Sequence, residues 1–351
     1  MIVRGIRRLA PSSSPGQIYE RLQTMTDHTV VITECDHDGF DPESAEAAKN
    51  DLTLRIEQST PEDLVANIQD ADGILVQYSQ ITADVMDQAP RLRAIGRYGV
   101  GVDTVDIDAA TDRGIAVTNV PDYGTEAVSD HAIGLAVSLA RGIPLLDRSI
   151  RAGQYDVSLA KPLFQMTDRT FGVLGLGRIG TATARKAAGL GYRVIGHDFG
   201  IESGTRHHGV EVVSFEELIE QSQVLSVHVP LTEHTRGMIG RDQLAAMRSD
   251  ALLVNTARGG IIDTDALVEA LRAGGIGGAG IDCHEQEPLP ATHPIAALDN
   301  VVLTPHAAWY TEQSYVELKR RTLEGVADVL AGRSPRNLLN PAALDHPRVI
   351  G

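Results

Sequence analysis

The chain has 351 residues, 42% of them apolar, and a formal net charge of -16 at pH 7. This length and apolar content suffice for two hydrophobic cores of ordinary domain size, while the negative charge disfavours direct binding to nucleic acid or to an anionic membrane surface. Two cysteines are too few for a disulfide framework and no apolar run is long enough to span a membrane, so we expect a cytoplasmic protein.

The first 24 residues lack the pattern of a folded domain. Arg4, Arg7 and Arg8 precede a segment rich in proline and serine, and the apolar stretch of a signal peptide is missing. We predict a disordered extension over residues 1–24.

From residue 28 the sequence alternates short β-branched runs with helical patterns. One predicted helix starts at Thr60, with threonine as its cap and Pro61 at its first helical position. Strands are predicted over residues 28–33, 52–56, 73–77, 93–97 and 115–118. The alternation predicts a small parallel α/β domain that ends where residues 119–121 interrupt the pattern.

A second series of α/β units follows. Helices are predicted over residues 125–141 and 145–153, and strands over 171–174, 192–196, 224–227, 251–254, 276–281 and 301–303. A last helix over residues 311–331 and the segment 337–341 return to the first domain. The sequence therefore predicts a discontinuous first domain, residues 25–120 and 309–345, into which residues 121–308 are inserted as a second domain.

The first strand of the inserted domain leads into a glycine-rich turn. Gly175, Gly177 and Gly180 form a G-x-G-x-x-G motif between this strand and an amphipathic helix. Such a turn lets the backbone and the helix N-terminus approach a pyrophosphate. Asp198 stands 18 positions after Gly180, at the end of the next strand, where a carboxylate would hold a ribose diol.

Distinctive ionisable residues follow three later strands. Arg258 comes after the first of them, Asp282 and Glu287 after the second, and His306 after the third. Neighbouring strands lie about 4.8 Å apart, so the loops that carry these residues can converge.

This set of residues suits hydride exchange at a carbon that bears a carboxylate. Arg258 can bind a carboxylate with a bidentate fork, His306 can donate a proton to a ketone oxygen, and Glu287 can favour the imidazolium and orient it. Taken singly, Arg258 could bind a cofactor phosphate, Glu287 could be a solvated loop acid and His306 a core histidine. Their position on three successive strand ends favours the catalytic interpretation.

These motifs resemble those of the D-isomer-specific 2-hydroxyacid dehydrogenases. The resemblance rests on the glycine turn, residues 255–263, residues 287–288 and residues 304–307, and it extends from about residue 28 to residue 341. It implies an α/β fold in which a Rossmann-type doubly wound parallel sheet is inserted into a smaller flavodoxin-like α/β substrate domain. It also implies Arg258, Glu287 and His306 as the catalytic residues of an NAD-dependent D-2-hydroxyacid dehydrogenase, working as a 2-ketoacid reductase.

Within the family, the chain is similar to the C-terminal-binding-protein branch, which includes dehydrogenases and animal corepressors. The similarity lies in residues 97–103, 281–288 and above all 306–310. It implies a substrate loop in which the amides of Val100 and Gly101 bind a carboxylate beside Arg97. Trp309 would line the substrate cavity or serve as an interface aromatic, and Tyr78 lies near another loop that affects specificity.

The resemblance also implies the cofactor contacts. Arg178 and Ile179 would present amides to the pyrophosphate, and Val229 and Pro230 would border the adenine. Asp282, Thr256 and Ala257 would meet the carboxamide of nicotinamide. Asp198 should repel a 2′-phosphate and select NAD over NADP. Two features count against a strict selection: relatives often have proline or arginine where Phe199 and Gly200 follow Asp198 here, and Arg193 and Arg206 are nearby.

A metal site is not expected from the sequence. Residues 35–38 and 282–284 cluster suitable ligand types, but neither has the two- to four-residue gaps of a zinc site. Solvated loops and a strand end are the better interpretation of these two segments.

Two other functions stay open at this point. One is an NADH-responsive binding protein like the corepressors; we take the short segment after residue 341 as an argument against it. The other is a sister dehydrogenase acting on 3-phosphoglycerate, formate or phosphite. The expected partners are a small 2-ketoacid or 2-hydroxyacid and a second copy of the chain, joined through the helix near residues 125–141. Simple burial would also explain the apolar character of that helix.

Overall fold

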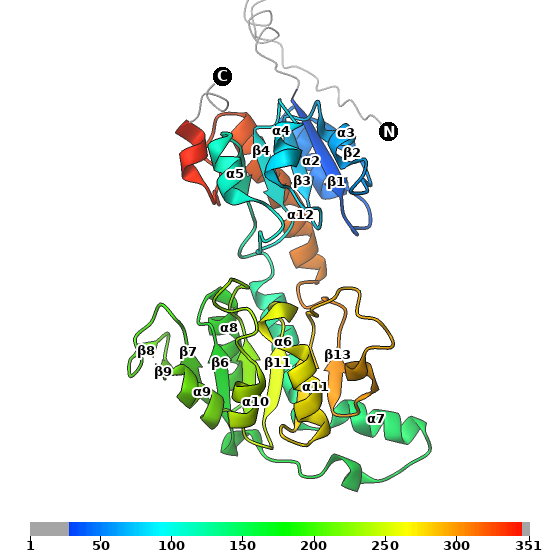
Figure 1. Ribbon diagram of the computed structural model, residues 1–351, viewed down its shortest axis with the longest axis vertical. Helices are drawn as coiled ribbons and strands as arrows, with labels where there is room; N and C mark the ends of the chain where they lie inside the picture. Colours follow the sequence, from blue (N-terminus) through cyan, green and yellow to red (C-terminus); the bar gives the residue numbers. More distant parts are fainter. Residues whose placement is uncertain (1–27, 346–351) are drawn as a thin grey trace, which may run out of the picture. The chain divides into compact units, whose positions relative to one another are not determined.

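A computed structural model describes residues 28–345, and its chain divides into two compact units (Figure 1). One unit ends at Tyr123 and resumes at Glu312, and the other comprises Gly124–Thr311. Both breaks lie a few residues from the boundaries expected after residue 120 and before residue 309. The extension predicted over residues 1–24 lies outside the described residues.

The first unit is built on a five-stranded parallel sheet in the order β2-β1-β3-β4-β5. This is the strand order of flavodoxin-like sheets. The strands are β1 (Thr29–Glu34), β2 (Thr53–Ile56), β3 (Gly73–Val76), β4 (Ala94–Arg97) and β5 (Ala116–Thr118).

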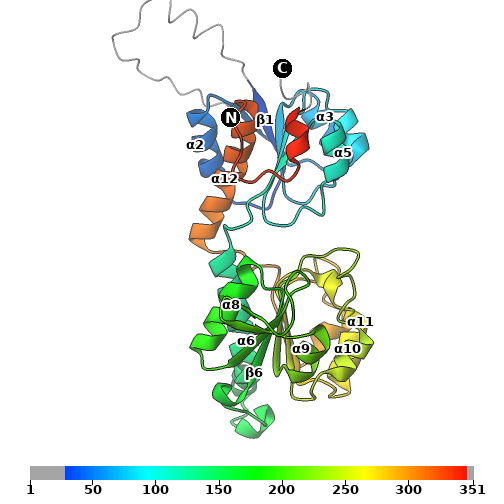
Figure 2. The ribbon, with the colours of Figure 1, turned by 90° about the vertical axis from the view of Figure 1, so that its left-hand side faces the viewer.

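Helices cover both faces of this sheet (Figure 2). They are α2 (Asp41–Lys49), α3 (Leu64–Ile68), α4 (Ala83–Asp87), α5 (Ile107–Asp112) and α12 (Glu312–Leu330). Helix α12 lies directly on β3 and β4 because Gly73 and Gly96 leave room for Val326; a Cβ atom at either glycine would lie within 3 Å of a Val326 methyl group. The segment after α12 joins the edge of the sheet, where Asn340 Oδ1 accepts the N–H of Val117.

The start predicted for one helix at Thr60 is wrong. Helix α3 begins at Leu64, and residues 61–63 form a turn. The main-chain carbonyl of Thr60 accepts the N–H groups of Asp63 and Leu64, and Asp63 occupies the cap position.

The second unit has an eight-stranded sheet in the order β13-β12-β11-β10-β6-β7-β9-β8. All neighbouring strands are parallel except β8 and β9. The chain runs outward from β6 in both directions, so the topological switch point lies between β6 and β10. The strands are β6 (Thr170–Leu174), β7 (Arg193–His197), β8 (Arg206–His207), β9 (Val210–Val212), β10 (Val224–Val227), β11 (Leu252–Asn255), β12 (Gly278–Ile281) and β13 (Val301–Leu303).

Helices also sandwich the second sheet (Figure 2). On one side lie α6 (Thr125–Ala140) and α8 (Arg178–Gly189); on the other lie α9 (Phe215–Gln221), α10 (Arg241–Ala246) and α11 (Thr264–Arg272). At the start of α9, Ser214 and Glu217 form a capping box through reciprocal hydrogen bonds. Helix α7 (Ile143–Arg151) and the short helix η1 (Val157–Ala160) follow α6.

The β8–β9 hairpin was not predicted from the sequence. Its strands are too short for a pattern to be visible, and its turn depends on left-handed backbone at His208 and Gly209. Across residues 28–345, no helix combines the length and apolar character that crossing a membrane requires.

Candidate active site

The turn after β6 has the shape that its glycines predict. Gly175 has a φ of 93°, and a Cβ atom there would lie 2.8 Å from the carbonyl carbon of His228. A Cβ at Gly180 would lie 1.8 Å from the carbonyl oxygen of Gly175. Both positions therefore require glycine, the first for the turn and the second for the contact between helix and turn.

The same turn fits a pyrophosphate. Gly177 precedes α8, no side chain caps this helix, and a Cβ at Gly177 would meet no atom within 4 Å. The open space therefore lies where the helix N-terminus concentrates positive potential, beside the first helical residues Arg178 and Ile179.

Asp198 connects the end of β7 to the glycine turn. Its Oδ2 atom accepts the N–H of Leu176 at 2.8 Å, and its Oδ1 atom accepts the N–H of Gly200 at 2.9 Å. The carboxylate is thus fixed beside the turn, and its contact with a ribose diol stays a prediction.

The remaining predicted cofactor residues follow neighbouring strands. Val229 is buried beside the glycine turn; its main-chain nitrogen lies 2.9 Å from where a Cβ atom on residue 175 would be. The carbonyl of Pro230 accepts a hydrogen bond from Thr235. Thr256 and Ala257 follow β11, and Asn255 Oδ1 accepts the N–H of Ala257.

Three loops meet where β11, β12 and β13 end side by side. A Cβ at Gly259 would lie 2.0 Å from the carbonyl carbon of His284, so the loop after β11 is packed directly against the loop after β12. The loop after β13 is joined to that of β12 by hydrogen bonds from His306 and Ala307 to Asp282. The expected convergence of these three strand ends is therefore present within one unit.

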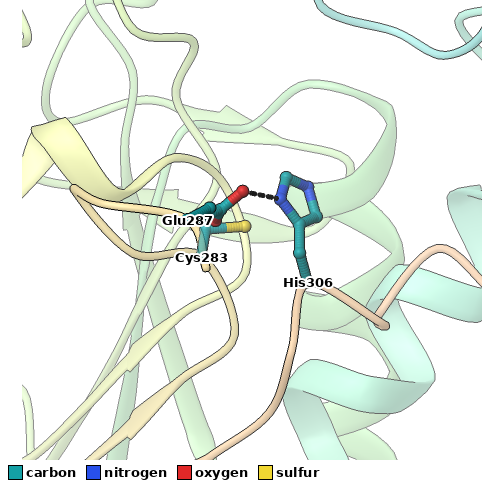
Figure 3. Close-up of side chains that lie close together, drawn as sticks. All are labelled: Cys283, Glu287 and His306. Atoms are coloured by element: carbon teal, nitrogen blue, oxygen red, sulfur yellow. Dashed lines mark hydrogen bonds and ion pairs between the residues drawn. The ribbon is translucent and has the colours of Figure 1, made fainter. Parts of the chain in front are cut away.

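His306 and Glu287 form a hydrogen-bonded pair (Figure 3). His306 Nδ1 lies 2.8 Å from Glu287 Oε2, and each side chain is 36% exposed. Glu287 Oε1 accepts the N–H of His284. Burial disfavours the charged carboxylate, but the hydrogen bond and charge of His306 and the N–H of His284 hold the pKa of Glu287 below its usual range.

Arg258 lies on the adjacent loop, half-buried. Its main-chain carbonyl accepts a hydrogen bond from Asn255, and its Nη1 atom donates to the carbonyl of Ala257 at 2.9 Å. Burial raises the pKa of the Cys283 thiol, the charges of Asp282 and Glu287 add to that rise, and the charge of Arg258 opposes it. Arg258 is thus held on a loop that is packed directly against the loop carrying Glu287.

Cys283 lies next to Glu287 (Figure 3). Its side chain is 1% exposed, and burial raises the pKa of its thiol, as does the neighbouring Asp282 carboxylate. The ligand atoms of Cys283, Glu287 and His306 lie within 4.8 Å of one another, compared with about 3.5 Å between ligand atoms around tetrahedral zinc. The three side chains are thus a looser set than a formed zinc site, and the absence of a metal stays a prediction.

Asp282 is fully buried, and its carboxylate binds the loop that carries His306. Its Oδ1 atom accepts hydrogen bonds from Thr304 Oγ1 and the N–H of Ala307, and its Oδ2 atom accepts the N–H of Ala308. Its contact with a nicotinamide carboxamide stays a prediction.

The predicted substrate residues are divided between the two units. All four belonging to the first unit lie at neighbouring strand ends: Tyr78 follows β3, Arg97 is the last residue of β4, and Val100 and Gly101 follow it. Tyr78 is 54% exposed and its hydroxyl donates to Asp36.

Trp309 was placed by the sequence in the substrate domain, but it belongs to the second unit. That unit runs to Thr311, beyond the boundary predicted at residue 308. The Trp309 ring is half-buried and meets Tyr310 edge to face, with centroids 5.6 Å apart.

Sequence reasoning missed His131 and His284, which contact Thr304 in the His306 loop. His131 lies inside a long helical pattern 173 residues from Thr304, so no local motif connects the two. For His131 the only sequence signal was a histidine among the small and apolar residues of α6.

The chain is similar to known proteins over most of its length. Residues 133–308 match the model of the family described as D-isomer specific 2-hydroxyacid dehydrogenase, NAD binding domain. The chain is 40% identical to a glyoxylate reductase of Korarchaeum cryptofilum over 282 residues, covering 79% of this chain and 85% of the relative.

Two further relatives extend the comparison. A D-3-phosphoglycerate dehydrogenase of Methanocaldococcus jannaschii is also 40% identical, over 80% of this chain, but the chain spans only 54% of that protein. A crystal structure of D-lactate dehydrogenase from Aquifex aeolicus, complexed with NAD and lactic acid, superposes with a TM-score of 0.78 at 28% identity, covering 89% of this chain and 99% of the other.

Proposed function

The chain belongs to the D-isomer-specific 2-hydroxyacid dehydrogenases, and from that premise we propose that it reduces small 2-ketoacids such as glyoxylate, with Arg258, Glu287 and His306 as its catalytic residues. It is an NAD-dependent enzyme that transfers hydride between NADH and a 2-ketoacid. The observation that carries the catalytic assignment is the 2.8 Å contact between His306 and Glu287, on loops packed against that of Arg258.

Each of the three side chains has a distinct task in the proposed mechanism. Arg258 binds the substrate carboxylate and polarises the adjacent carbonyl. His306 uses Nδ1 for Glu287, so its Nε2 atom donates the proton to the carbonyl oxygen in reduction and accepts it in the reverse direction. Glu287 stabilises the imidazolium that this exchange requires. Bound NADH supplies the hydride.

We assign the cofactor contacts to the turn and strand ends of the second unit. The open space at Gly177 supports a pyrophosphate site, and the fixed carboxylate of Asp198 supports selection of NAD over NADP. In the first unit, the amides of Val100 and Gly101, with Arg97 and Tyr78, are the proposed substrate contacts. Trp309 is the proposed contact of the second unit with the substrate side chain.

The choice of a small ketoacid is supported by the relatives. Proteins named glyoxylate reductase are 40% identical in Korarchaeum cryptofilum and Thermofilum pendens, and the chain spans 85% of each. We also place the chain in the C-terminal-binding-protein branch, on the strength of residues 306–310. An NADH-responsive binding protein of that branch is the alternative function.

NADH consumption by the purified protein distinguishes these functions. We expect turnover with glyoxylate or hydroxypyruvate that exceeds turnover with phenylpyruvate, branched 2-ketoacids or 3-phosphohydroxypyruvate. Bound NADH without turnover on any of these would support the binding-protein function. Preference for 3-phosphohydroxypyruvate would instead support the phosphoglycerate enzymes.

We further propose a homodimer formed through the segment that follows α6. Helix α6 itself packs against α8, β11 and β12, so burial in the second unit explains its apolar character. The segment after it leaves six large apolar side chains exposed, an arrangement typical of interfaces; they are Ile143, Ile150, Tyr155, Val157, Leu159 and Phe164.

Sedimentation velocity tests the dimer. Tyr155→Glu combined with Val157→Glu should shift the protein to the monomer mass, because a charged side chain would be buried in the interface. Leu190→Glu, at an exposed apolar position elsewhere in the same unit, serves as the control. A monomeric wild-type protein would exclude this arrangement.

The proposed location is the cytoplasm, consistent with the free thiols of Cys35 and Cys283.

A further inference from the structure

The loop that carries His306 has an unusual backbone. His306 has a φ of 54°, in the left-handed region that residues other than glycine rarely adopt. In this conformation its side chain meets Glu287. The surrounding contacts must therefore determine it.

The carboxylate of Asp282 is one such contact. It accepts the N–H groups of Ala307 and Ala308, which directly follow His306, and the hydroxyl of Thr304, two residues before it. The main-chain carbonyl of Asp282 accepts the N–H of His306 at 2.8 Å. A single buried residue thus binds the loop on both sides of His306.

Thr304 is held in turn by two histidines. His131 Nε2 lies 3.0 Å from Thr304 Oγ1. The hydroxyl has one hydrogen, and it is directed to Asp282 Oδ1 at 2.5 Å, because a carboxylate can only accept. Oγ1 must therefore accept from His131, which requires a proton on its Nε2 atom. The direct separation of His131 Nε2 from Asp282 Oδ1 is 3.6 Å, so Thr304 mediates the contact.

The second histidine contacts the main chain of Thr304. His284 Nε2 lies 3.0 Å from the main-chain carbonyl of Thr304, to which it can only donate. The main-chain N–H of His284 donates to Glu287 Oε1 at 2.8 Å. His284 therefore connects the loop that carries Glu287 to the loop that carries His306.

We propose that His131 and His284 are positioning residues, which donate hydrogen bonds to the hydroxyl and carbonyl of Thr304 and so hold His306 in line with Glu287. The inference rests on the proposed function, because it gives these histidines a role through the Glu287–His306 pair. All five residues belong to the second unit. The arrangement resembles the outer partners of metal-bound histidines, whose loss typically costs 10- to 100-fold in activity.

Paired substitutions test the proposal. His131→Leu and His284→Leu remove the donor, whereas His131→Gln and His284→Gln retain an N–H group at nearly the position of Nε2. We expect each leucine variant to lower kcat about 10- to 100-fold with KM and NADH affinity changed less than about twofold, and each glutamine variant to recover most of the loss. A leucine variant with wild-type kcat, or a loss that glutamine does not restore, would overturn it.

Thr304 supplies an independent check. Thr304→Ser retains the hydroxyl and should stay near wild-type activity, whereas Thr304→Val should lose activity like His131→Leu. Combining Thr304→Val with His131→Leu should cost little more than Thr304→Val alone, because both remove the same contact. Additive losses would show that the two side chains act independently, which would contradict the proposal.

Nitrogen-15 NMR of the wild-type protein tests the hydrogen bonds without any variant. The proposal expects a proton on Nε2 of both histidines, slowed in exchange with solvent. A neutral His131 protonated only on Nδ1 would overturn it. If the wild-type protein reduced no ketoacid, the proposed function would fail, while this measurement would still decide whether the hydrogen bonds exist.

Discussion

Both carboxylate oxygens of Glu287 are engaged: Oε2 lies 2.8 Å from Nδ1 of His306, and Oε1 accepts the main-chain N–H of His284. The carboxylate therefore has a fixed orientation, and so does the imidazole that it faces. With Nδ1 directed to Glu287 (Figure 3), the Nε2 atom of His306 is left for the proton exchange that we propose.

Glu287→Gln should lower kcat for ketoacid reduction roughly 100-fold, because an amide can accept the hydrogen bond but cannot stabilise the imidazolium. The loss should grow with rising pH, so that the alkaline limb of the pH–rate profile moves to lower pH. The measurement is kcat/KM between pH 5 and pH 9. Glu285→Gln, on the exposed neighbouring position, is the control; an unchanged profile in the Glu287 variant would remove the carboxylate from the mechanism.

His306→Ala should lose the chemical step by about 10²- to 10⁴-fold while NADH binds with unchanged affinity. The reason is that the side chain serves proton transfer and makes no proposed contact with the dinucleotide. Steady-state kinetics and NADH fluorescence titration measure the two effects separately. His234→Ala, in an exposed loop of the same unit, is the control, and normal turnover by the His306 variant would refute the assignment.

Asp198→Asn should raise the ratio of NADP to NAD efficiency by roughly tenfold, about 1.4 kcal/mol, because the charge that repels a 2′-phosphate is removed. The amide oxygen still accepts the N–H of Leu176, so the turn is retained. Asp198→Ala should show the same change in ratio and also weaker NAD binding. If the ratio stayed constant in both variants, discrimination would have to reside elsewhere.

Glu43→Ala should destabilise the first unit by about 3–5 kcal/mol, because it leaves a buried cation without its counter-charge. Lys319 is 1% exposed, its Nζ atom lies 3.6 Å from Glu43 Oε2, and Tyr98 donates to Glu43 Oε1. Urea unfolding measures the loss. Combining Glu43→Gln with Lys319→Met should cost much less, since both charges are then absent; an equal loss would show that packing, and not charge, dominates.

The stability of the first unit should fall as pH decreases from about 6.5 to about 4 through His37. Burial, together with the charge of Lys319, lowers the pKa of His37 to about 4, whereas an unfolded histidine titrates near 6.5. Between these values the unfolded chain binds a proton that the folded chain does not, which costs about 2 kcal/mol between pH 7 and pH 5. His37→Gln should reduce that difference in urea unfolding and His234→Gln should not; equal pH dependence in wild type and His37→Gln would contradict the shift.

The sequence by itself determined the features that depend on local pattern. Alternating β-branched and amphipathic runs predicted parallel α/β architecture, and the glycine spacing at residues 175–180 predicted the turn, because only glycine tolerates the positive φ and close approach found there. Their positions at successive strand ends also indicated Arg258, Glu287 and His306 as candidate catalytic residues, since neighbouring parallel strands end at the same edge of a sheet. Their roles remain predictions for the experiments above.

Only the tertiary structure decided how these residues are held. Hydrogen bonds across 173 and 22 residues place His131 and Asp282 against Thr304, and no local periodicity encodes contacts of that range. The left-handed backbone of His306 and the full burial of Asp282 are likewise consequences of three loops packing together. Local sequence specifies strands and turns because these depend on neighbouring residues, whereas the orientation of a catalytic side chain depends on residues that meet only after the sheet has formed.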